Sequence, residues 1–350
     1  MEPSARVRAR AGASMKSFAR VWALAVIVVL ASCSSEREVH VLNVSFDPTR
    51  EFYQEVNAAF AAEWKAKTGN TLTLQTSHGG SGKQARSVID GLRADIVTLA
   101  LAGDIDNIAL NSRALPVGWQ ARLPNNSSPY TSTIVFLVRR GNPKGIHDWG
   151  DLAKPGVTVV TPNPKTSGGA RWNFLAAWAW GQRQFNNDEP RVREFVQALY
   201  RNAPLLDTGA RGSTTTFVNR RIGDVLIAWE NEALLVLNQP SGHQYELVTP
   251  SLSINAEPPV ALIDRNVDAR GTRAAAEGFL QFLYSPKGQA LAAKHHFRPY
   301  RAEGVDAAVL AKFESVELVD IQHFGGWAAA QKTYFAEGAV FDQLYQGGVR

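Results

Sequence analysis

Residues 71–93 read TLTLQTSHGGSGKQARSVIDGLR, and the order of residue types predicts a strand, a loop and a helix. Thr71–Thr76 alternates apolar with polar or β-branched side chains, as a strand with two different faces does. SHGGSG (residues 77–82) is small and glycine-rich, which is typical of a loop, and Lys83–Arg93 has helical character. A strand that leads through glycine into a helix is the building unit of parallel α/β sheets.

A glycine loop before a helix suits an anion, because free N–H groups and the helix dipole both point at it. A nucleotide-binding P-loop is excluded: Gly82-Lys83 would need glycine where Ser77 stands and a hydroxyl where Gln84 stands. A hydrolase elbow around Ser81 is excluded too, because Lys83 replaces its last glycine. The loop is therefore suited to an anion without matching either common enzyme template.

The same order of strand, short turn and helix recurs along the chain. Strands separated by helices predict an α/β fold with parallel sheets and right-handed crossovers. In such sheets ligands bind at the carboxyl ends of the strands. The expected strands are 39–46, 71–76, 95–101, 132–140, 157–161 and 224–229, with a long helix at 169–185 and helical character over 272–295.

The N-terminus has the features of an export signal. Lys16 and Arg20 precede eleven apolar residues, VWALAVIVVLA (21–31). Eleven are too few for a transmembrane helix, which needs roughly 20.

The next feature is a possible lipid attachment site. LASC (30–33) resembles a bacterial lipobox, and Cys33 is the only cysteine of the chain. We expect residues 1–33 to be a lipoprotein signal peptide with lipid on Cys33. An ordinary signal peptide with a chance cysteine is the alternative, and Met15 is a second candidate start.

The net charge of +5 depends largely on this leader. Residues 1–33 hold five of the 37 basic residues and one of the 32 acidic ones, which leaves 32 basic and 31 acidic residues beyond them. A nearly neutral mature chain gives no support for nucleic-acid binding. With Cys33 spent on lipid, no thiol remains for a disulfide, a metal or a nucleophile.

Four segments share one design, in which a strand ends, small residues follow and a helix begins. Four such turns in one exported chain indicate convergence on a single small oxyanion. They are SFDPT (45–49), SHGGSGKQ (77–84), NPKTSGGAR (163–171) and DTGARGS (207–213).

These motifs, with VLNVSFDPTREFY (41–53) and GDVLIAWENEALL (223–235), resemble the sulfate/thiosulfate-binding proteins of bacterial ABC importers. The likeness runs from about Leu42 to the C-terminus. It implies a two-lobed periplasmic binding protein fold of type II, the Venus-flytrap, in which each lobe is a mainly parallel sheet flanked by helices and the ligand lies in the cleft. The expected lobes are 34–128 with 256–350, and 129–255, joined near residues 125–132 and 250–258.

The resemblance also implies a site that holds one dianion with uncharged donors. Lys83, Arg171 and Arg211 adjoin the turns, and we expect them to support the donors; direct pairing with the anion is the alternative. Lys165 is expected to face solvent. The implied ligand groups are the backbone N–H groups of Asp47, Gly168, Gly169 and Ala210, the hydroxyls of Ser81 and Ser167, and the indole N–H of Trp229.

Physical chemistry separates sulfate from phosphate. Sulfate at neutral pH only accepts hydrogen bonds, whereas phosphate keeps a proton that would cost about 1–3 kcal/mol if buried without an acceptor. Asp47 leaves the choice open. Its carboxylate either faces the ligand and favours phosphate, or caps its own helix.

The implied function is capture of sulfate, and of thiosulfate as a further ligand, for delivery to the permease subunits of an ABC transporter with a cytoplasmic ATPase. The expected protein is periplasmic, anchored through Cys33, monomeric, and free of cofactors, metals and nucleic acid.

One alternative is a binding protein for phosphate or molybdate. The other is an exported enzyme on a phosphate or sulfur ester, although Glu230, Glu232 and His295-His296 form no recognisable catalytic or metal cluster. Trp172, Trp178 and Trp180 are expected to pack the long helix.

Overall fold

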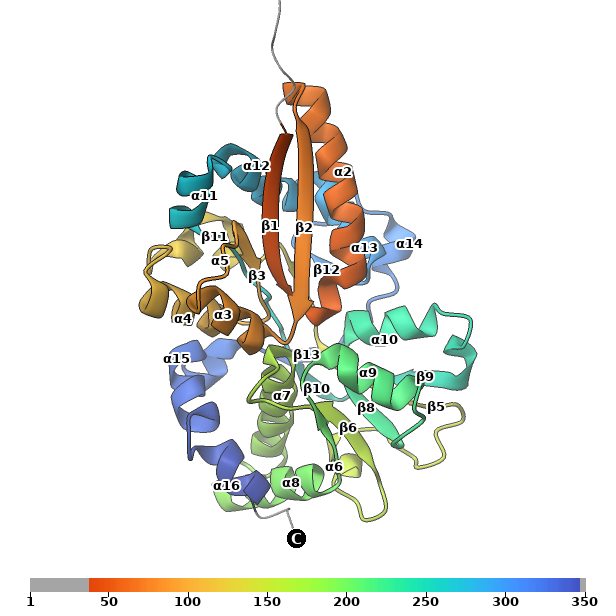
Figure 1. Cartoon of the computed structure of the whole chain (residues 1–350). Helices are drawn as coiled ribbons and strands as arrows, with labels where there is room; N and C mark the ends of the chain where they lie inside the picture. Colours follow the sequence, from red (N-terminus) through yellow and green to blue (C-terminus); the bar gives the residue numbers. More distant parts are fainter. Residues whose placement is uncertain (1–37, 347–350) are drawn as a thin grey trace, which may run out of the picture. The chain divides into compact units, whose positions relative to one another are not determined.

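Two β-sheets organise the computed structural model, which describes residues 38–346 (Figure 1). The first sheet has the strand order β11-β3-β1-β2. Its strand β1 is parallel to both β2 and β3, while β11 is antiparallel to β3. We call the part of the chain built on this sheet the first lobe. Its strands are β1 (Glu38–Phe46), β2 (Thr71–Gly79), β3 (Ile96–Thr98) and β11 (Val260–Leu262).

The second sheet has the order β7-β6-β8-β5-β9 and defines the second lobe. Strand β5 is antiparallel to both of its neighbours, and the β6–β7 and β6–β8 pairs are parallel. The first sheet is therefore mainly parallel, as predicted, whereas the second has two parallel and two antiparallel pairs. The strands are β5 (Ile134–Arg139), β6 (Val159–Pro162), β7 (Leu206–Asp207), β8 (Val225–Trp229) and β9 (Tyr245–Val248).

Helices cover both sheets because each has an apolar face to bury. In α2, Phe52, Val56 and Phe60 recur every four residues and are buried, and the helix ends at Gly69 in a left-handed conformation with φ 74°. In α7, the burial of Trp172, Trp178 and Trp180 confirms their expected packing role. The helices of the first lobe are α2 (Arg50–Thr68), α3 (Ser81–Ile89), α4 (Ala102–Ser112), α5 (Pro124–Ser127), α11 (Asp264–Arg270), α12 (Arg273–Leu283), α13 (Pro286–Lys294) and α14 (Ala307–Leu310). Those of the second are α6 (Trp149–Leu152), α7 (Gly168–Gln184), α8 (Glu189–Arg201), α9 (Ala210–Val218) and α10 (Glu230–Leu237).

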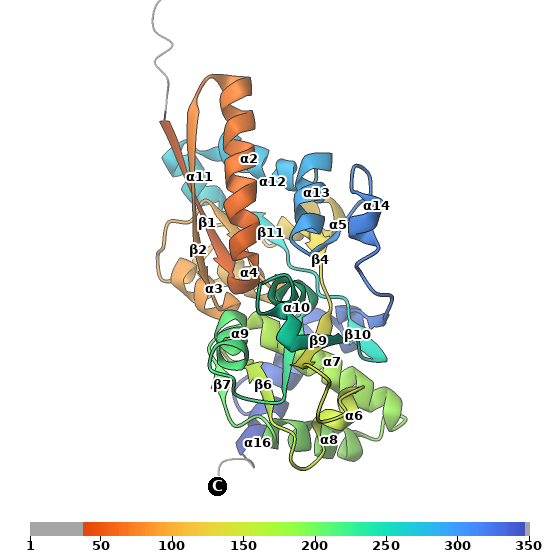
Figure 2. The same ribbon diagram turned by 90° about the vertical axis from the view of Figure 1, so that its right-hand side faces the viewer.

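The chain passes between the sheets in the two segments that the sequence suggested. Ser132 and Ala256 form an antiparallel bridge there, so the two connections run side by side. The chain crosses between the lobes a third time after β12 (Arg298–Pro299) and before β13 (Glu317–Val319). Strand β12 pairs with β4 (Tyr130–Thr131), and β13 pairs with β10 (Leu252–Ile254). Two of these strands, β4 and β10, are labelled in Figure 2.

Residues 321–346 contact the second lobe, although the sequence-based boundaries placed 256–350 in the first. Helix α16 (Val340–Gln346) lies beside α8 (Figure 1), and Phe335 and Phe341 both pack edge-on against Phe174 of α7. An aromatic cluster thus holds this segment to the second lobe. The other elements of the segment are η4 (Ile321–Phe324), α15 (Gly326–Ala330) and the π-helical turn Gln331–Phe335.

Two boundaries around the opening motif differ from the prediction. Strand β2 continues to Gly79 and α3 begins at Ser81, so the predicted loop 77–82 shrinks to Gly80. The cause is pairing with β1, which holds His78 opposite Ser45 and Gly79 opposite Phe46. The predicted signal peptide and Cys33 lie outside the described residues. Among the residues described, no helix combines the length and apolar character needed to cross a bilayer.

Candidate functional site

All seven candidate residues lie at the carboxyl ends of strands. Asp47 opens the 3-10 turn η1 (Asp47–Thr49) directly after β1, and Trp229 is the last residue of β8. The other five lie at the N-terminal ends of three helices, α3, α7 and α9, that follow β2, β6 and β7. Strand ends and helix starts therefore supply every candidate donor, as expected for an α/β site.

The turns of the two lobes touch each other at Gly80. A Cβ atom on Gly80 would lie 2.6 Å from the carbonyl oxygen of Thr166 and 2.9 Å from that of Thr208. Both carbonyls belong to the second lobe, whereas Gly80 precedes α3 of the first. Glycine is required here because a side chain would force the two lobes apart.

Gly168 makes a second contact between the lobes. A Cβ atom at this position would lie 2.9 Å from the Cβ atom of Ser81 and 2.8 Å from that of Ala100. At the next residue, a Cβ atom on Gly169 would lie 3.1 Å from the indole nitrogen of Trp229. These distances bring Ser81, Gly168, Gly169 and Trp229 together in one neighbourhood.

The start of α7 carries several unshared donors. Gly168 and Gly169 are its first two residues, and N–H groups in the first turn have no acceptor within their helix. Ser167 caps the helix, and its hydroxyl oxygen accepts a hydrogen bond from the backbone N–H of Ala170 at 3.3 Å. The hydroxyl proton of Ser167 therefore remains available to a ligand oxygen.

The hydroxyl of Ser81 has a different role from the one expected. It donates to a carboxylate oxygen of Asp104 at 2.5 Å and accepts from the backbone N–H of Ala100 at 3.0 Å. A hydroxyl has one proton, so this group cannot also donate to an anion. The backbone N–H of Ser81, which is the first residue of α3, is the donor left for a ligand.

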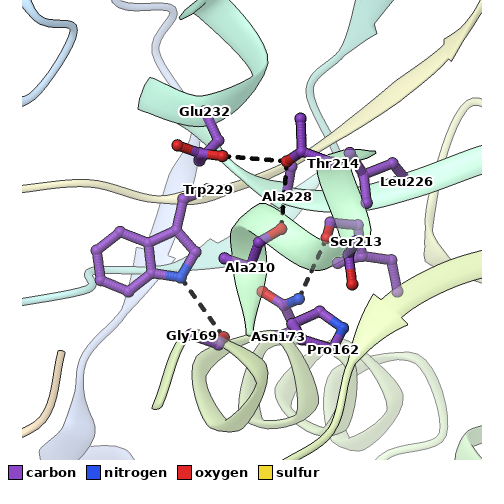
Figure 3. A pocket seen from close by; sticks show the side chains of 11 residues that line it. Pro162, Gly169, Asn173, Ala210, Ser213, Thr214, Leu226, Ala228, Trp229 and Glu232 are labelled. Atoms are coloured by element: carbon purple, nitrogen blue, oxygen red, sulfur yellow. Dashed lines mark hydrogen bonds between the residues drawn. The ribbon is translucent and has the colours of Figure 1, made fainter. Parts of the chain in front are cut away.

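Trp229 is fully buried at the end of β8 and packs against Phe46, with ring centroids 5.3 Å apart. Its indole N–H approaches the carbonyl oxygen of Gly169 at 3.5 Å, which is long for a hydrogen bond. Figure 3 shows the indole nitrogen pointing toward the start of α7. The pocket in that view is lined by Pro162, Gly169, Asn173, Ala210, Ser213, Thr214, Leu226, Ile227, Ala228, Trp229 and Glu232.

The carboxylate of Asp47 does not cap its own helix, which was one of the two placements that the sequence left open. The N-cap is Phe46 and the turn has no side-chain cap bond, because Asp47 is itself the first helical residue. One carboxylate oxygen lies 3.6 Å from the Arg50 guanidinium, and the other lies directly against Gly209, the residue before Ala210. Burial raises the pKa of Asp47, opposed by the positive charges of Arg50, Arg211 and Lys83.

Arg171 pairs with a carboxylate on the opposite lobe. Its guanidinium lies 3.2 Å from Asp104, which is also the acceptor for Ser81, and its Nε donates to the Pro164 carbonyl at 2.9 Å. Asp104 thus contacts both Ser81 at the start of α3 and Arg171 in the first turn of α7. Sequence reasoning missed Asp104, because nothing local marks a carboxylate whose partner is 67 residues away.

Arg211 is held by two carboxylates, one from each lobe. It forms a two-pronged pair with Glu51 of α2 at 2.7 and 2.8 Å, and it reaches the buried Glu232 of α10 at 2.9 Å. Burial alone would raise the pKa of Glu51, but the hydrogen bonds and charge of Arg211 lower it. Burial raises the pKa of Glu232 despite the same arginine.

The remaining charged candidates lie farther out. Lys83 is exposed on α3. Lys165 does not simply face solvent as expected: its ammonium donates to the Phe335 and Ala336 carbonyls at 3.1 Å and pairs with Asp342 at 2.6 Å. The C-terminal segment, which the sequence had assigned to the other lobe, covers this lysine.

The histidine pair has separate partners. His295 pairs with Glu55 at 2.7 Å, and the His296 ring lies 2.7 Å from the amide nitrogen of Asn238. Residues 38–346 contain no cluster of three or more histidine, cysteine, aspartate or glutamate side chains that could hold a metal ion.

Comparison with known proteins identifies the family. Residues 48–298 match the family model of bacterial extracellular solute-binding proteins. The chain belongs to this family. It is 55% identical to the sulfate-binding protein of Escherichia coli (strain K12) over 329 residues, which are 92% of this chain and 98% of the relative. It is 49% identical to the thiosulfate-binding protein of Pseudomonas aeruginosa over 306 residues, 87% of this chain and 92% of the relative.

A solved structure supports the same conclusion for the fold. The sulfate-binding protein SubI from Mycobacterium tuberculosis superposes with a TM-score of 0.74 at 32% identity, covering 85% of this chain and 99% of its own. The two-lobed architecture of this solute-binding protein is therefore confirmed. The two curated relatives described above are named as binding proteins, and the family is described as extracellular.

Proposed function

We propose that this solute-binding protein captures sulfate, and thiosulfate as a second ligand, and delivers it to the membrane permease of an ABC importer. The observation that carries the proposal is the convergence of uncharged donors from both lobes, while the cations beside them are bound to carboxylates. Relatives named for sulfate and thiosulfate add support across nearly the whole chain. The work of the protein is binding and lobe closure, with the anion favouring the closed state.

The proposed ligand set follows the sequence-based set with one change. The anion receives hydrogen bonds from the hydroxyl of Ser167 and, in place of its hydroxyl, the backbone N–H of Ser81. Every proposed group donates and none accepts, which matches a fully deprotonated dianion. The other proposed donors are the backbone N–H groups of Asp47, Gly168, Gly169 and Ala210 and the indole N–H of Trp229.

Phosphate is the second candidate, and the placement of Asp47 favours it. Its carboxylate lies against Gly209, next to the proposed donor of Ala210, where it could accept the proton that phosphate retains. Burial raises the pKa of Asp47, and the positive charges of Arg50, Arg211 and Lys83 oppose that rise. Sulfate remains the first candidate because the other proposed groups all donate.

Localisation and partners complete the proposal. We infer that the chain is exported, acylated on Cys33 and held at the membrane surface as a monomer. A single lipid anchor keeps a binding protein close to its permease, whose partner ATPase is cytoplasmic. Mass spectrometry of the protein from a bacterial host tests the anchor: a mature N-terminus at Cys33 carrying lipid is expected. An unmodified cysteine or cleavage elsewhere would contradict it.

Calorimetry tests the ligand. The full chain, expressed in a bacterial host and purified in detergent with sulfate-free buffers, is titrated with sulfate, thiosulfate, phosphate and molybdate. We expect saturable heat with micromolar or lower sulfate and thiosulfate. Tight binding of phosphate or molybdate without a response to sulfate would reject the sulfate assignment. In that case the D47A variant should lose phosphate affinity, because the acceptor carboxylate is removed while the backbone N–H stays.

A further inference from the structure

The three residues after Trp229 form an unusual start to a helix. Glu230, Asn231 and Glu232 open α10, and the side chains of all three are about 2% exposed. None of them caps the helix, because its N-cap is Trp229 and makes no side-chain bond. Buried polar groups are nearly always hydrogen-bonded, so their partners must lie elsewhere.

The partners of Glu230 and Asn231 belong to the first lobe, whereas Glu232 bonds within the second, where Thr214 also donates to it at 3.0 Å. Glu230 pairs with Arg298 through two bonds of 2.7 Å. Glu232 accepts a hydrogen bond from Arg211, which also pairs with Glu51 of α2 in the first lobe. Asn231 donates from its amide nitrogen to the backbone carbonyl oxygen of Pro48 at 3.1 Å.

The bond of Asn231 links two proposed anion contacts directly. Asn231 follows Trp229 by two residues, and Pro48 follows Asp47 by one. The bond therefore joins the end of β8 in the second lobe to the turn after β1 in the first. Within residues 38–346, the amide oxygen of Asn231 has no hydrogen-bond partner. Its amide group thus makes its polar contact across the lobes and not within its own lobe.

We propose that Asn231 is a positioning residue that couples anion binding to lobe closure, an inference that rests on the proposed function. When the lobes separate, the amide and the Pro48 carbonyl exchange their mutual bond for water. When the lobes meet, the bond fixes Trp229 relative to Asp47. Because apparent affinity follows the population of the binding-competent state, loss of this bond weakens the affinity for the anion.

The neutral character of the bond gives it a distinct signature. Asn231 and the Pro48 carbonyl carry no net charge, so salt should not change their contribution. The pair of Arg211 with Glu51, by contrast, is partly exposed and weakens as salt rises. A loss of affinity that is equal at low and high salt separates the two kinds of contact.

The test compares N231L and N231D with N202L. Leucine keeps the γ-branch of asparagine but removes its polar atoms, whereas aspartate would set a carboxylate against a carbonyl oxygen. Asn202 is the matched control, because its amide donates to the Leu152 and Lys154 carbonyls, both at 2.8 Å, inside the second lobe. Sulfate affinity is measured by calorimetry, dissociation by stopped-flow tryptophan fluorescence, and stability by the Tm of the protein without ligand.

We expect N231L to bind sulfate about 5–10-fold more weakly than the wild type, mainly through faster dissociation and equally at both salt concentrations. N231D should bind more weakly still, and N202L should lower the Tm while its Kd stays within about twofold. If N231L has the wild-type Kd, or loses no more affinity than N202L, the inference about Asn231 is wrong while the proposed function stands. A wild type that binds neither sulfate nor thiosulfate overturns the proposed function and this inference with it.

Discussion

Two kinds of group lie side by side at this site. The turns at Ser167–Gly169 and Gly209–Ala210 present uncharged donors, whereas the arginine side chains that follow them are charged and form ion pairs. Arg171 is bound to Asp104, and Arg211 is bound to Glu51 and Glu232. The turns and the pairs are only one or two residues apart in sequence. Their chemistry nevertheless differs completely.

The difference shows how a binding protein divides two tasks. Backbone N–H groups at helix starts attract an anion through partial charges, without a full counter-ion in contact with it. The ion pairs join the lobes and add a modest free energy to closure. The Arg211–Glu51 pair is partly exposed, and for the buried Arg171–Asp104 pair the cost of desolvation offsets much of the attraction. On this view the turns determine which anion binds, and the pairs adjust how long the lobes stay together.

The largest expected effect on sulfate affinity comes from adding a side chain at Gly168, where the two lobes are in contact. In G168A, a Cβ atom would overlap Ala100, Ser81 and Leu101 of the first lobe at 2.8–3.0 Å. Overpacking of this kind costs about 1–3 kcal/mol, so sulfate affinity should fall up to about 100-fold. Calorimetry provides the measurement.

G181A in the same helix is the control for that prediction. There the added Cβ atom would meet Phe195 and Val192 of α8 within the second lobe, at 3.1 and 3.2 Å. It should lower the Tm without changing the Kd. Equal losses of affinity in G168A and G181A would mean that contact between the lobes at Gly168 is not what matters.

The next effect tests a neutral donor. W229F keeps an aromatic ring against Phe46 but removes the indole N–H. A hydrogen bond to a charged ligand contributes about 1.5–3 kcal/mol, so the Kd for sulfate should rise about 10–100-fold. W149F is the control, because the Trp149 indole donates to the Leu252 carbonyl at 2.8 Å, away from the anion turns. A Kd unchanged in W229F would remove Trp229 from the ligand set.

Much of this arrangement could be predicted from sequence, for identifiable reasons. Strand ends followed by glycine and a helix start have local signals, so α7 was expected within one residue of its observed start at Gly168. The resemblance supplied the two-lobed fold, which the family match and the solved relative confirm. Helix periodicity and turn residues are local properties, and they survive tertiary packing.

What could not be predicted depends on partners far apart in sequence. The Ser81 hydroxyl was expected at the ligand, but it donates its hydrogen bond to Asp104, 23 residues away. The direction of the Asp47 carboxylate was left open, and in the structure it lies against Gly209. Arg211 meets Glu51 across 160 residues. A side chain's direction is decided by such contacts, which no local pattern records.

The third prediction concerns the charged pairs. E51Q keeps the side-chain shape but removes the charge facing Arg211, and sulfate affinity should fall only about 2–5-fold because the pair is partly exposed. The loss should shrink as salt rises. E55Q on the same helix is the control, since Glu55 pairs with Lys294 and His295 of its own lobe. A loss above about 50-fold in E51Q would make this pair as important as the neutral donors.

The pH dependence of the same pair has a definite sign. The pKa of Glu51 is lowered below 4.5, since Arg211 outweighs the effect of burial. A carboxyl with a lowered pKa stabilises the folded, paired state above its ordinary pKa and loses this contribution as the pH falls through the folded value. The difference in Kd between the wild type and E51Q should therefore be constant near neutral pH and narrow only below about pH 4.5.

The smallest effect is expected at Lys83, the residue that first suggested a nucleotide. Its ammonium is exposed on α3, and charges in water are screened over about 8 Å at physiological salt. K83M should change the Kd for sulfate less than about twofold at that salt, and slightly more at low salt. K67M, at the far end of α2 beside Glu63, is the control for a general loss of positive charge. A tenfold loss in K83M alone would place a full positive charge in contact with the anion, and the division between neutral turns and paired cations would no longer hold.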